Sequence, residues 1–477
     1  MKNHKRTATW ERVIDRRERL GIPASRLDYR PVQERIQDFD EACLGFSLET
    51  AMAEASRCIH CPSPEGCVLA CPLHNQIPAA MWEISEGRLL EAAAIYRQTS
   101  NFPELCGRLC PDESLCAGSC CVGKHYANIR LGRLEAFVAD YQREAHGLPI
   151  PPVPPPTGRQ VAVVGSGPAG LTVAEELSKR GHAVTVLEMR PKPGGMLAYT
   201  IPRFRLPVHI VEAKVTQLER LGVQFVVGTR VGRDVTVDDL FRQGYHAVFL
   251  GTGAGFEAAA HLPGADLQGI YLATEFMLHT NLGKAYMPPD DQSPIPTGKH
   301  VVIFGGGHAA VDCARTAVRL GAQKVTCYHP GREMDALCRL EDKSAAQDEH
   351  VHFVTLTEPV SLIGDERGHV VRVQCRRVRG NGPIREGQPA PHDGSLFAVD
   401  ADMVVLASER GPDPQIVEAT PGLEMEPGGW MISDSETGET TRRGVFAAGD
   451  NTGQSQLAVI AIAKGRKVAT SIHEYLR

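Results

Sequence analysis

Short apolar runs of strand length alternate with helical patterns over most of the chain after residue 158. Val161–Val164 is such a run, and a glycine-rich turn, a helical pattern and a second run at Ala183–Leu187 follow it. This order predicts a strand–helix–strand unit, which begins a parallel sheet. A second unit of this kind begins at His300, and Met403–Ala407 and Gly444–Ala448 indicate later buried strands.

The first part of the chain follows a different pattern. Leu89–Tyr96 and Arg130–Tyr141 are expected helices, and irregular, cysteine-rich loops lie around them. Between Leu148 and Gly158 the chain has six prolines, which exclude a helix or a central strand. We therefore expect a helical domain, a stiff linker, and then the units with parallel sheets, closed by a helix over Leu457–Thr470.

Composition and charge narrow the class of protein. A chain of 477 residues corresponds to about three domains, and 42% hydrophobic and 23% charged residues are typical of a globular protein. The net charge of −6 argues against general nucleic-acid binding. No apolar run approaches the length of a membrane helix, and the N-terminus lacks the apolar core of a signal peptide. We expect a cytoplasmic protein without membrane insertion.

The turn after the first expected strand has the sequence GSGPAG and opens a helix. Gly165 permits the tight turn, Gly167 lets the backbone approach a pyrophosphate, and Gly170 allows close helix packing. The helix N-terminus favours the negative charge of such a group. Glu188 ends the next strand, where a carboxylate can accept a hydrogen bond from a ribose hydroxyl. These features together predict a dinucleotide site.

A second turn, GGGHAA over Gly305–Ala310, stands in the same position between a strand and a helix. It has the spacing G-x-G-x-x-A, and we expect a second dinucleotide there. His308 is a candidate hydrogen-bond donor to this ligand or a surface histidine, and Asp312 is a candidate brace for the loop. The strand after this helix ends without an acid, which slightly favours NADP over NAD, with Arg332 as the candidate partner of the 2′-phosphate.

Ten of the 14 cysteines lie between Cys43 and Cys121. One group has the spacing C-x2-C-x5-C-x3-C-P from Cys58, and the other has C-x3-C-x5-C-x3-C-C from Cys106. The first group is similar to the ferredoxin run C-x2-C-x2-C-x3-C-P. Thiolates suit iron–sulfur clusters and zinc alike, and free thiols are a third alternative. We favour two [4Fe–4S] clusters, because zinc would not explain cysteines beside a dinucleotide-binding unit.

Four segments resemble the glutamate synthase small-subunit family: Asn101–Pro111, Pro193–Pro207, Leu250–Gly253 and Val445–Asp450. The resemblance implies an α/β chain with an N-terminal helical Fe–S domain and two Rossmann-like units of the glutathione-reductase-like type. The implied domains are residues 1–147 with two clusters, 158–288 and 403–477 for FAD, and 289–402 for NAD(P). The implied FAD contacts are Gly165, Gly167, Pro168, Ala169, Gly170, Glu188, Gly195, Leu197, Arg205, Thr252, Gly253, Gly449 and Asp450. A surface salt bridge is the alternative for Arg205.

The same resemblance assigns the remaining ligands. The implied nicotinamide-cofactor contacts are Gly305, Gly307, His308, Ala309, Ala310 and Arg332. One cluster would be held by Cys58, Cys61, Cys67 and Cys120, and the other by Cys71, Cys110, Cys116 and Glu135. Cys106 and Cys121 are left over, and either is an alternative fourth ligand to Glu135.

The expected function is electron transfer between NAD(P)H, FAD, two clusters and a large partner subunit or ferredoxin. A flavin is needed between the other two groups, because nicotinamides deliver two electrons as hydride and clusters accept one at a time. Hydride transfer needs no protein acid or base, so the sequence assigns no catalytic residue. The alternatives are a stand-alone flavoprotein reductase and a non-catalytic Fe–S scaffold subunit.

Overall fold

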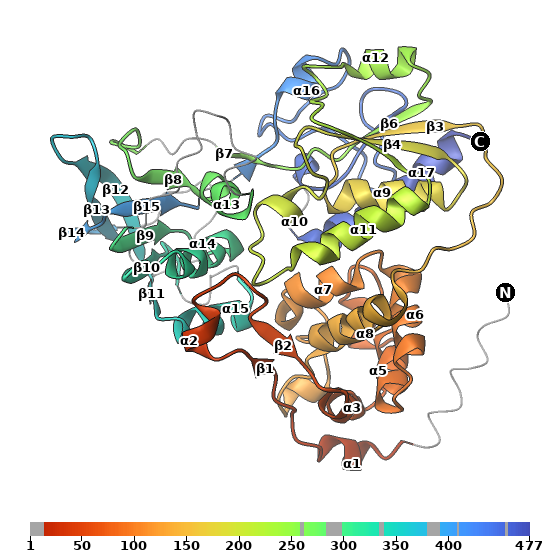
Figure 1. The fold of residues 1–477 in the computed structure, drawn as a ribbon, viewed down its shortest axis with the longest axis horizontal. Helices are drawn as coiled ribbons and strands as arrows, with labels where there is room; N and C mark the ends of the chain where they lie inside the picture. The colour runs from red at the N-terminus through yellow and green to blue at the C-terminus, as the bar shows by residue number, and fades with distance from the viewer. Residues whose placement is uncertain are drawn as a thin grey trace.

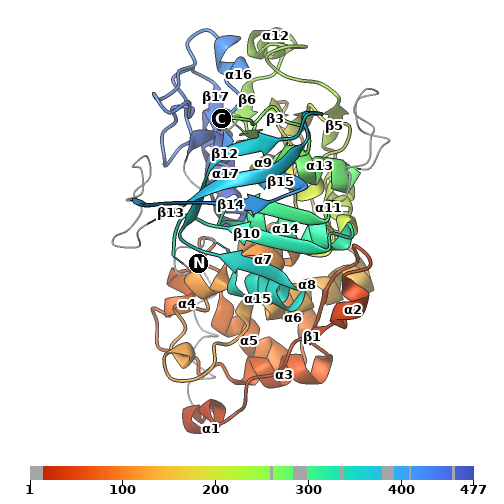
Figure 2. The same cartoon turned by 90° about the vertical axis from the view of Figure 1, so that its left-hand side faces the viewer.

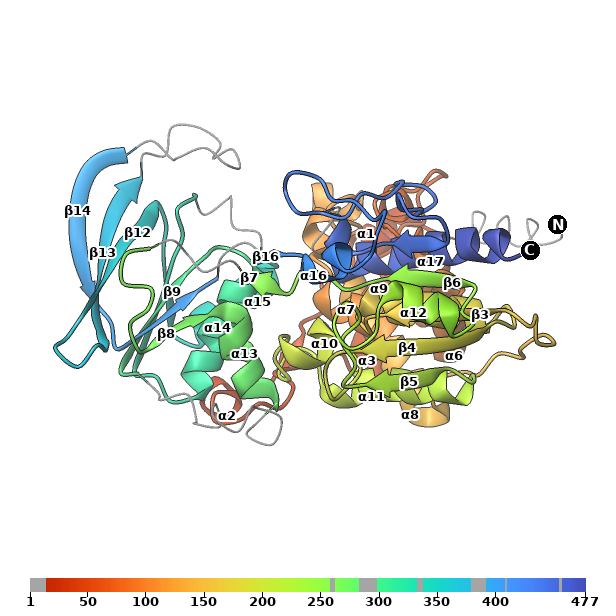
Figure 3. The same cartoon turned by 90° about the horizontal axis from the view of Figure 1, so that it is seen from above.

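The structure is a computed structural model that describes residues 14–257, 262–282, 298–332, 338–378, 392–407, 410–453 and 457–477. It has three parts: an N-terminal domain (residues 14–147), a first unit with one parallel sheet, and a second unit with another. Figure 1 shows the N-terminal domain below the first unit and the second unit to the left. Figure 3 shows from above that the two units lie side by side.

The N-terminal domain is helical, as the sequence predicts. The expected helices at Leu89–Tyr96 and Arg130–Tyr141 are α6 (Leu89–Thr99) and α8 (Leu131–His146). A small antiparallel pair, β1 (Asp28–Tyr29) and β2 (Cys43–Gly45), precedes them. The other helices are α1 (Arg16–Leu20), α2 (Val32–Arg35), α3 (Leu48–Ser56), α4 (Gly66–Leu69), α5 (Ile77–Ser85) and α7 (Pro103–Leu109).

The first unit contains a five-stranded parallel sheet in the order β17-β6-β3-β4-β5. Its strands are β3 (Gln160–Val164), β4 (Ala183–Glu188), β5 (Gln224–Val227), β6 (Ala247–Leu250) and β17 (Val445–Ala447). Its helices are α9 (Pro168–Ser178), α10 (Met196–Tyr199), α11 (Val208–Arg220), α12 (Val237–Arg242), α16 (Gln415–Glu418) and α17 (Ala458–Tyr475). Because β17 pairs with β6, two distant segments of the chain build this unit, as expected.

The second unit contains a parallel sheet in the order β11-β10-β9-β15-β8 and an antiparallel sheet β12-β13-β14. The parallel strands are β8 (Ile270–Leu272), β9 (His300–Phe304), β10 (Lys324–Tyr328), β11 (Val351–Val354) and β15 (Met403–Leu406). The antiparallel strands, in front in Figure 2, are β12 (Thr357–Gly364), β13 (Val370–Val378) and β14 (His392–Asp400). The helices are α13 (Ala273–Leu282), α14 (His308–Arg319) and α15 (Leu340–Asp348).

The sheets divide the chain at other residues than those expected. β8 lies before the expected boundary at 288 and β15 after the one at 402, yet both belong to the sheet of the second unit. The chain passes between the units at β7 (Phe256–Glu257) and β16 (Arg410–Gly411), which pair with each other. The boundary at 288 itself lies outside the described residues. The second unit therefore begins earlier and ends later than the sequence indicates.

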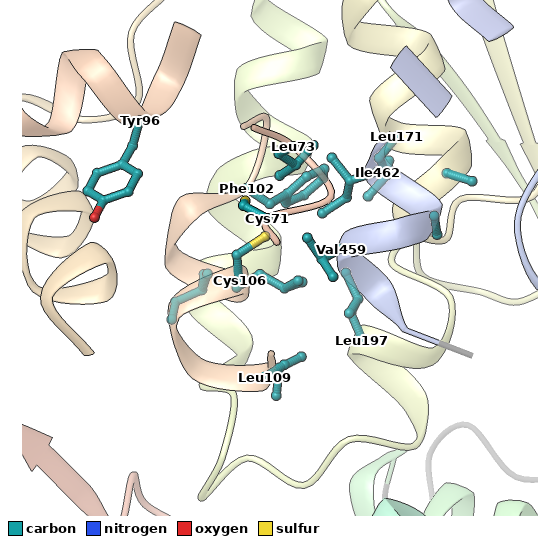
Figure 4. Packing of buried hydrophobic residues seen from close by; sticks show 14 of the residues in the cluster. Cys71, Leu73, Tyr96, Phe102, Cys106, Leu109, Leu171, Leu197, Val459 and Ile462 are labelled. Atoms are coloured by element: carbon teal, nitrogen blue, oxygen red, sulfur yellow. The ribbon is translucent and has the colours of Figure 1, made fainter. Parts of the chain in front are cut away.

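One hydrophobic core joins the N-terminal domain to the first unit. Figure 4 shows Phe102, just before α7, and Cys106 of α7 on one side and Leu171, Val459 and Ile462 of the first unit on the other. Polar contacts reinforce this interface, since the amide nitrogen of Asn101 donates to Glu176 over 3.0 Å. No helix in the described ranges combines the length and the apolar composition that crossing a membrane requires.

Candidate functional site

The first glycine-rich turn leaves open space where a pyrophosphate is expected. Gly165 has φ +93°, and a Cβ there would lie 2.4 Å from the carbonyl oxygen of Gly251. A Cβ on Gly170 would lie 2.0 Å from the carbonyl oxygen of Gly165. A Cβ on Gly167 would meet no atom within 4 Å. Gly165 and Gly170 thus permit close backbone packing, whereas Gly167 opens the N-terminus of α9 to a ligand.

Glu188 fastens this turn to the following loop. Its carboxylate accepts hydrogen bonds from the backbone nitrogen and the hydroxyl of Ser166, at 3.0 and 2.5 Å, and from the backbone nitrogen of Arg190 at 2.9 Å. The Ser166 hydroxyl accepts in turn from the backbone nitrogen of Gly194. A carboxylate offers about four lone-pair positions, so Glu188 keeps acceptor capacity for the expected ribose hydroxyl.

The other candidate FAD residues gather at the same edge of the sheet, apart from Arg205. A Cβ on Gly195 would lie 2.8 Å from the Cα of Gly167. A Cβ on Gly449 would lie 3.3 Å from the Cβ of Ala169. Thr252 and Gly253 follow β6, Asp450 follows β17, and Leu197 is buried in α10. The carboxyl ends of β3, β6 and β17 thereby surround the N-terminus of α9, as the sequence pattern indicates.

Arg205 connects the first unit to the second. Its guanidinium contacts Asp312 at 2.6 Å and Asp342 at 2.9 Å, and all three residues are buried. Burial raises the pKa of Asp312 to about 6, although the positive charge of Arg205 opposes the shift. The ion pair is therefore internal, not the surface salt bridge considered from the sequence. The bracing role of Asp312 at the turn stays a prediction, and so does a flavin contact of Arg205.

The second glycine-rich turn borders a cavity in the second unit. Its lining includes Gly305, Gly306, His329 and Lys343. Gly305 has φ +152°, and a Cβ on Gly306 would lie 2.2 Å from Nδ1 of His329, so the histidine ring packs directly on the turn. Lys343 was not found from the sequence, because it lies on α15, far from the motif, and resembles an ordinary solvated charge.

The remaining residues predicted at this turn are not among those that line the cavity. Ala309 and Ala310 stand in the first turn of α14 after Gly307, and Arg332 is exposed after the end of β10. Burial and then the charge of Arg205 lower the pKa of His308 to about 4. A neutral imidazole of this kind can donate one hydrogen bond to a ligand.

The second set of predicted cluster ligands lines one cavity. Its wall includes Cys71, Cys110, Cys116 and Glu135, together with Cys106. Burial raises the pKa of Cys116 and of Glu135 well above their usual ranges, and Glu104 adds to the shift of Glu135. Buried thiols and a buried carboxyl become anionic when a positively charged group binds them, and an iron–sulfur core supplies that charge. The donor set therefore fits a cluster.

The first set of predicted ligands also comes together. Burial raises the pKa of Cys58 to about 12 and that of Cys61 to about 11, and neighbouring thiols, including Cys120, add to both shifts. The pKa of Cys67 is raised in the same way, first by burial and then by the thiols of Cys58, Cys120 and Cys61. Of the two extra cysteines, Cys121 lies beside Cys61, whereas Cys106 lines the second cavity. Cys106 and Glu135 thus remain alternatives there.

Two arginines of α1 hold the loop of the first set. Arg19 donates to the carbonyl oxygen of Cys58 over 2.9 Å, and Arg16 donates to those of Ile59 and His60 over 3.1 and 3.0 Å. In the described part of the chain, no three His, Cys, Asp or Glu side chains converge as ligands of one metal ion. Cluster ligands need not converge in that way, because each of them binds a different iron atom.

Comparison with known proteins identifies matches to both halves of the chain. The family described as dihydropyrimidine dehydrogenase domain II, 4Fe-4S cluster, matches residues 35–147. The family described as pyridine nucleotide-disulphide oxidoreductase matches residues 159–465. The break between the two matches falls in the proline-rich segment.

Individual relatives agree with these matches. The chain is 34% identical over 455 residues to the glutamate synthase (NADPH) small chain of Halomonas elongata, covering 94% of this chain and 95% of the relative. It is 33% identical over 436 residues to the NADP(+)-dependent formate dehydrogenase subunit beta of Moorella thermoacetica, covering 86% of this chain and 60% of the relative. Mycobacterium tuberculosis FprA in complex with NADPH has a similar fold, with a TM-score of 0.55 and 20% identity over 67% of this chain and 84% of FprA.

Proposed function

The chain belongs to the glutamate synthase small-chain family of oxidoreductases, and on this premise we propose that it is the electron-input component of a larger redox enzyme. Its substrate would be NAD(P)H, and its acceptor a partner subunit or ferredoxin. The family matches support FAD and NADP in the first and second units and Fe–S chemistry in the N-terminal domain. We assign one [4Fe–4S] cluster to each of two ligand sets, Cys58, Cys61, Cys67 and Cys120, and Cys71, Cys110, Cys116 and Glu135.

One observation carries this proposal: the first unit forms part of the wall of the second cysteine cavity. Val459, in the first turn of α17, lines the cavity with Cys71 and Cys116. The segment before α17 contains Gly449 and Asp450, two of the candidate FAD residues. The second set of predicted cluster ligands therefore lies against the flavin-binding unit. The first group is held by α1, which lies at the opposite end of the molecule from the first unit (Figure 1).

The residues present fit the groups that the family implies. A flavin, when bound, exchanges hydride with a nicotinamide and single electrons with iron–sulfur clusters. The protein's part is to bind and orient: Gly167 and the N-terminus of α9 would receive the pyrophosphate, and Glu188 the ribose. The turn from Gly305 to Ala310 would receive the second dinucleotide. Hydride transfer requires no acid or base of the protein, so the proposal assigns no catalytic residue.

We further propose NADPH as the preferred nicotinamide cofactor. No carboxylate stands at the end of β10, where an NAD-binding unit uses an acid. Lys343 instead lines the cavity beside the turn, and Arg332 is exposed nearby on the segment after β10. Two cations match the extra phosphate of NADPH. The partner is proposed as a larger subunit, because both relatives are named as a small chain or a subunit.

Anaerobic purification followed by iron, sulfide and flavin analysis tests these proposals directly. We expect about eight iron atoms and one FAD for each chain. NADPH at micromolar concentration should bleach the flavin band, and NADH should require far higher concentrations. Zinc in place of iron, or a flavin that neither nucleotide reduces, would refute the electron-input proposal. A stoichiometric partner that co-purifies with the chain would support the larger enzyme over a stand-alone reductase.

A further inference from the structure

The start of α15 contacts all three parts of the molecule. Arg339, just before the helix, is almost fully buried and donates to the carbonyl oxygen of Arg108 in the N-terminal domain. Its guanidinium lies 3.6 Å from Asp112 of the same domain. The backbone nitrogen of Leu340 donates to Glu113. These contacts attach a helix of the second unit to the N-terminal domain.

Glu341, in the first turn of α15, forms a second attachment. It accepts hydrogen bonds from the hydroxyl of Tyr29 and from the guanidinium of Arg133, both in the N-terminal domain. Burial alone would raise the pKa of this carboxyl, but Arg133 and Arg339 more than offset it and hold the pKa well below the usual range. Glu341 is therefore ionised and paired, and the loss of its charge would remove the carboxylate that Arg133 binds.

Asp342 connects the same helix to the first unit. It lies 2.9 Å from Arg205 of the first unit and 3.7 Å from Arg315 of α14. Arg205 also binds Asp312 of α14, the helix that the second glycine-rich turn opens. Arg339, Glu341 and Asp342 at the start of this helix thus connect the N-terminal domain, the first unit and α14.

The helix held in this way is also a wall of the second dinucleotide cavity. Lys343, one residue after Asp342, lines that cavity with Gly305 and Gly306. One core joins the N-terminal domain to the first unit. A rotation of the second unit relative to both would therefore break the ion pairs of Arg339 with Asp112 and of Glu341 with Arg133. Charged pairs without solvent permit few alternative arrangements, because a partner that is removed leaves a buried charge uncompensated.

We propose that Arg339 and Glu341 are positioning residues that hold the second unit, with its nicotinamide cofactor, in one orientation to the flavin. The inference rests on the proposed function, because it concerns the geometry of the proposed hydride transfer. In this arrangement the N-terminal domain has a second task besides carrying clusters, which is to fix the angle between the two Rossmann-like units. A misplacement of about 1 Å at a reacting centre can lower a rate by about 100-fold.

The test compares Glu341→Gln, Arg339→Met and Arg339→Lys with the full-length wild-type protein. The matched control is Arg376→Gln, which breaks a 2.6 Å ion pair with Glu358 inside the second unit only. Hydrogen–deuterium exchange of α14 and α15, measured without nucleotide, reports the attachment itself. Stopped-flow reduction of the flavin by saturating NADPH reports orientation, and reduction by dithionite reports the flavin without the nicotinamide.

We expect Glu341→Gln and Arg339→Met to keep wild-type FAD and iron contents and dithionite reduction. Exchange in α15 should rise, and reduction by NADPH should slow about tenfold or more. Arg339→Lys should recover part of the rate, and the control should behave as wild type. If α15 is loosened while NADPH reduction stays at the wild-type rate, or if exchange is unchanged, the inference is wrong. If neither variant folds, Tyr29→Phe replaces them, because it removes only the hydroxyl that donates to Glu341. We expect a smaller rise of exchange in α15 and a smaller loss of the NADPH reduction rate. Loosened α15 with a wild-type rate, or unchanged exchange, would again refute the inference.

Failure of the inference and failure of the proposed function give different results. If NADPH and NADH both leave the wild-type flavin oxidised, the proposed function fails before any variant is compared. If wild type is reduced and the variants match it, only the positioning role of Arg339 and Glu341 is refuted.

Discussion

The side-chain amide of Asn75 donates to the carboxylate of Glu135 over 3.3 Å inside the cavity that Cys71, Cys110 and Cys116 line. This carboxyl is buried, and burial raises its pKa well above the usual range. One neutral amide gives little compensation for a buried charge. The amide thereby orients a carboxyl that lies among three thiols, and the ligand role of Glu135 stays a prediction.

Replacement of Glu135 should remove one cluster and leave the other. Glu135→Ala takes away the candidate fourth ligand, so anaerobically purified protein should contain about four iron atoms in place of about eight. Cys106→Ser is the matched comparison, because Cys106 lines the same cavity. We expect that variant to retain the full iron content. The reverse result, with iron lost from Cys106→Ser and kept in Glu135→Ala, would make Cys106 the ligand.

We expect Gly167→Ala to weaken flavin binding and to leave folding unchanged. A Cβ at this position meets no protein atom within 4 Å, so the chain should fold with its usual thermal stability. The methyl group would occupy the space expected for the pyrophosphate, and purified protein should contain less than a tenth of the wild-type FAD. Absorbance of released flavin and thermal unfolding measure the two effects.

Gly170→Ala is the contrasting variant for that experiment. Its Cβ would lie 2.0 Å from the carbonyl oxygen of Gly165, so the backbone must move and stability should fall by about 1–3 kcal/mol. FAD retained by Gly167→Ala at the wild-type level would place the pyrophosphate elsewhere and contradict the proposed site.

Local pattern predicted the strands of this molecule but not the sheet to which each belongs. The run at Met403–Leu406 is buried on both sides, as expected of a parallel strand. Nothing in its composition distinguishes pairing with β9 from pairing with β6, because an apolar run fits either sheet. The same limit applies to β8, which precedes the expected boundary. Pairing depends on how the chain crosses between the units at β7 and β16.

The candidate sites were predictable only where a motif has a fixed spacing. The turns at Gly165 and Gly305 follow directly from strand, glycines and helix in order. The interleaved grouping of Cys120 with Cys58 came from family resemblance, and the mutual pKa effects of these thiols agree with it. Lys343 and the arginines of α1 carry no local signal, because a charged residue on a helix usually faces solvent.

Cofactor preference should depend on Lys343. Lys343→Gln removes a positive charge from the wall of the cavity beside Gly305 and Gly306. If the 2′-phosphate of NADPH binds there, the KM for NADPH should rise about tenfold or more, since a charge-assisted hydrogen bond is worth about 1.5–3 kcal/mol. The KM for NADH should change little. Steady-state reduction of an artificial acceptor with each nucleotide measures both values, and Lys179→Gln, on the first unit, is the control. An equal rise for both nucleotides would assign Lys343 to the shared part of the cofactor.

The pair His182 and His473 should make the protein less stable in acid. Nε2 of His182 and Nδ1 of His473 lie 2.8 Å apart, an arrangement that requires at least one neutral ring. Burial, then the charges of His473 and Arg180, lower the pKa of His182 to about 4. The unfolded chain has the ordinary value of about 6.5, so it takes up the proton first as the pH falls. The stabilisation is complete above pH 6.5 and is lost between pH 6.5 and about 4, with a slope of at most about 1.4 kcal/mol per pH unit.

His182→Asn should therefore flatten the acid side of the stability profile. Thermal unfolding at one scan rate, between pH 7.5 and 5, should show a smaller fall of Tm for this variant than for wild type. His146→Asn is the control, because this histidine is exposed at the end of α8 and should leave the profile unchanged. His308 has a lowered pKa of its own, so part of the wild-type slope should remain. A variant whose Tm falls as steeply as that of wild type would show that the proton is taken up elsewhere, and the contact between the two rings would then contribute nothing to acid sensitivity.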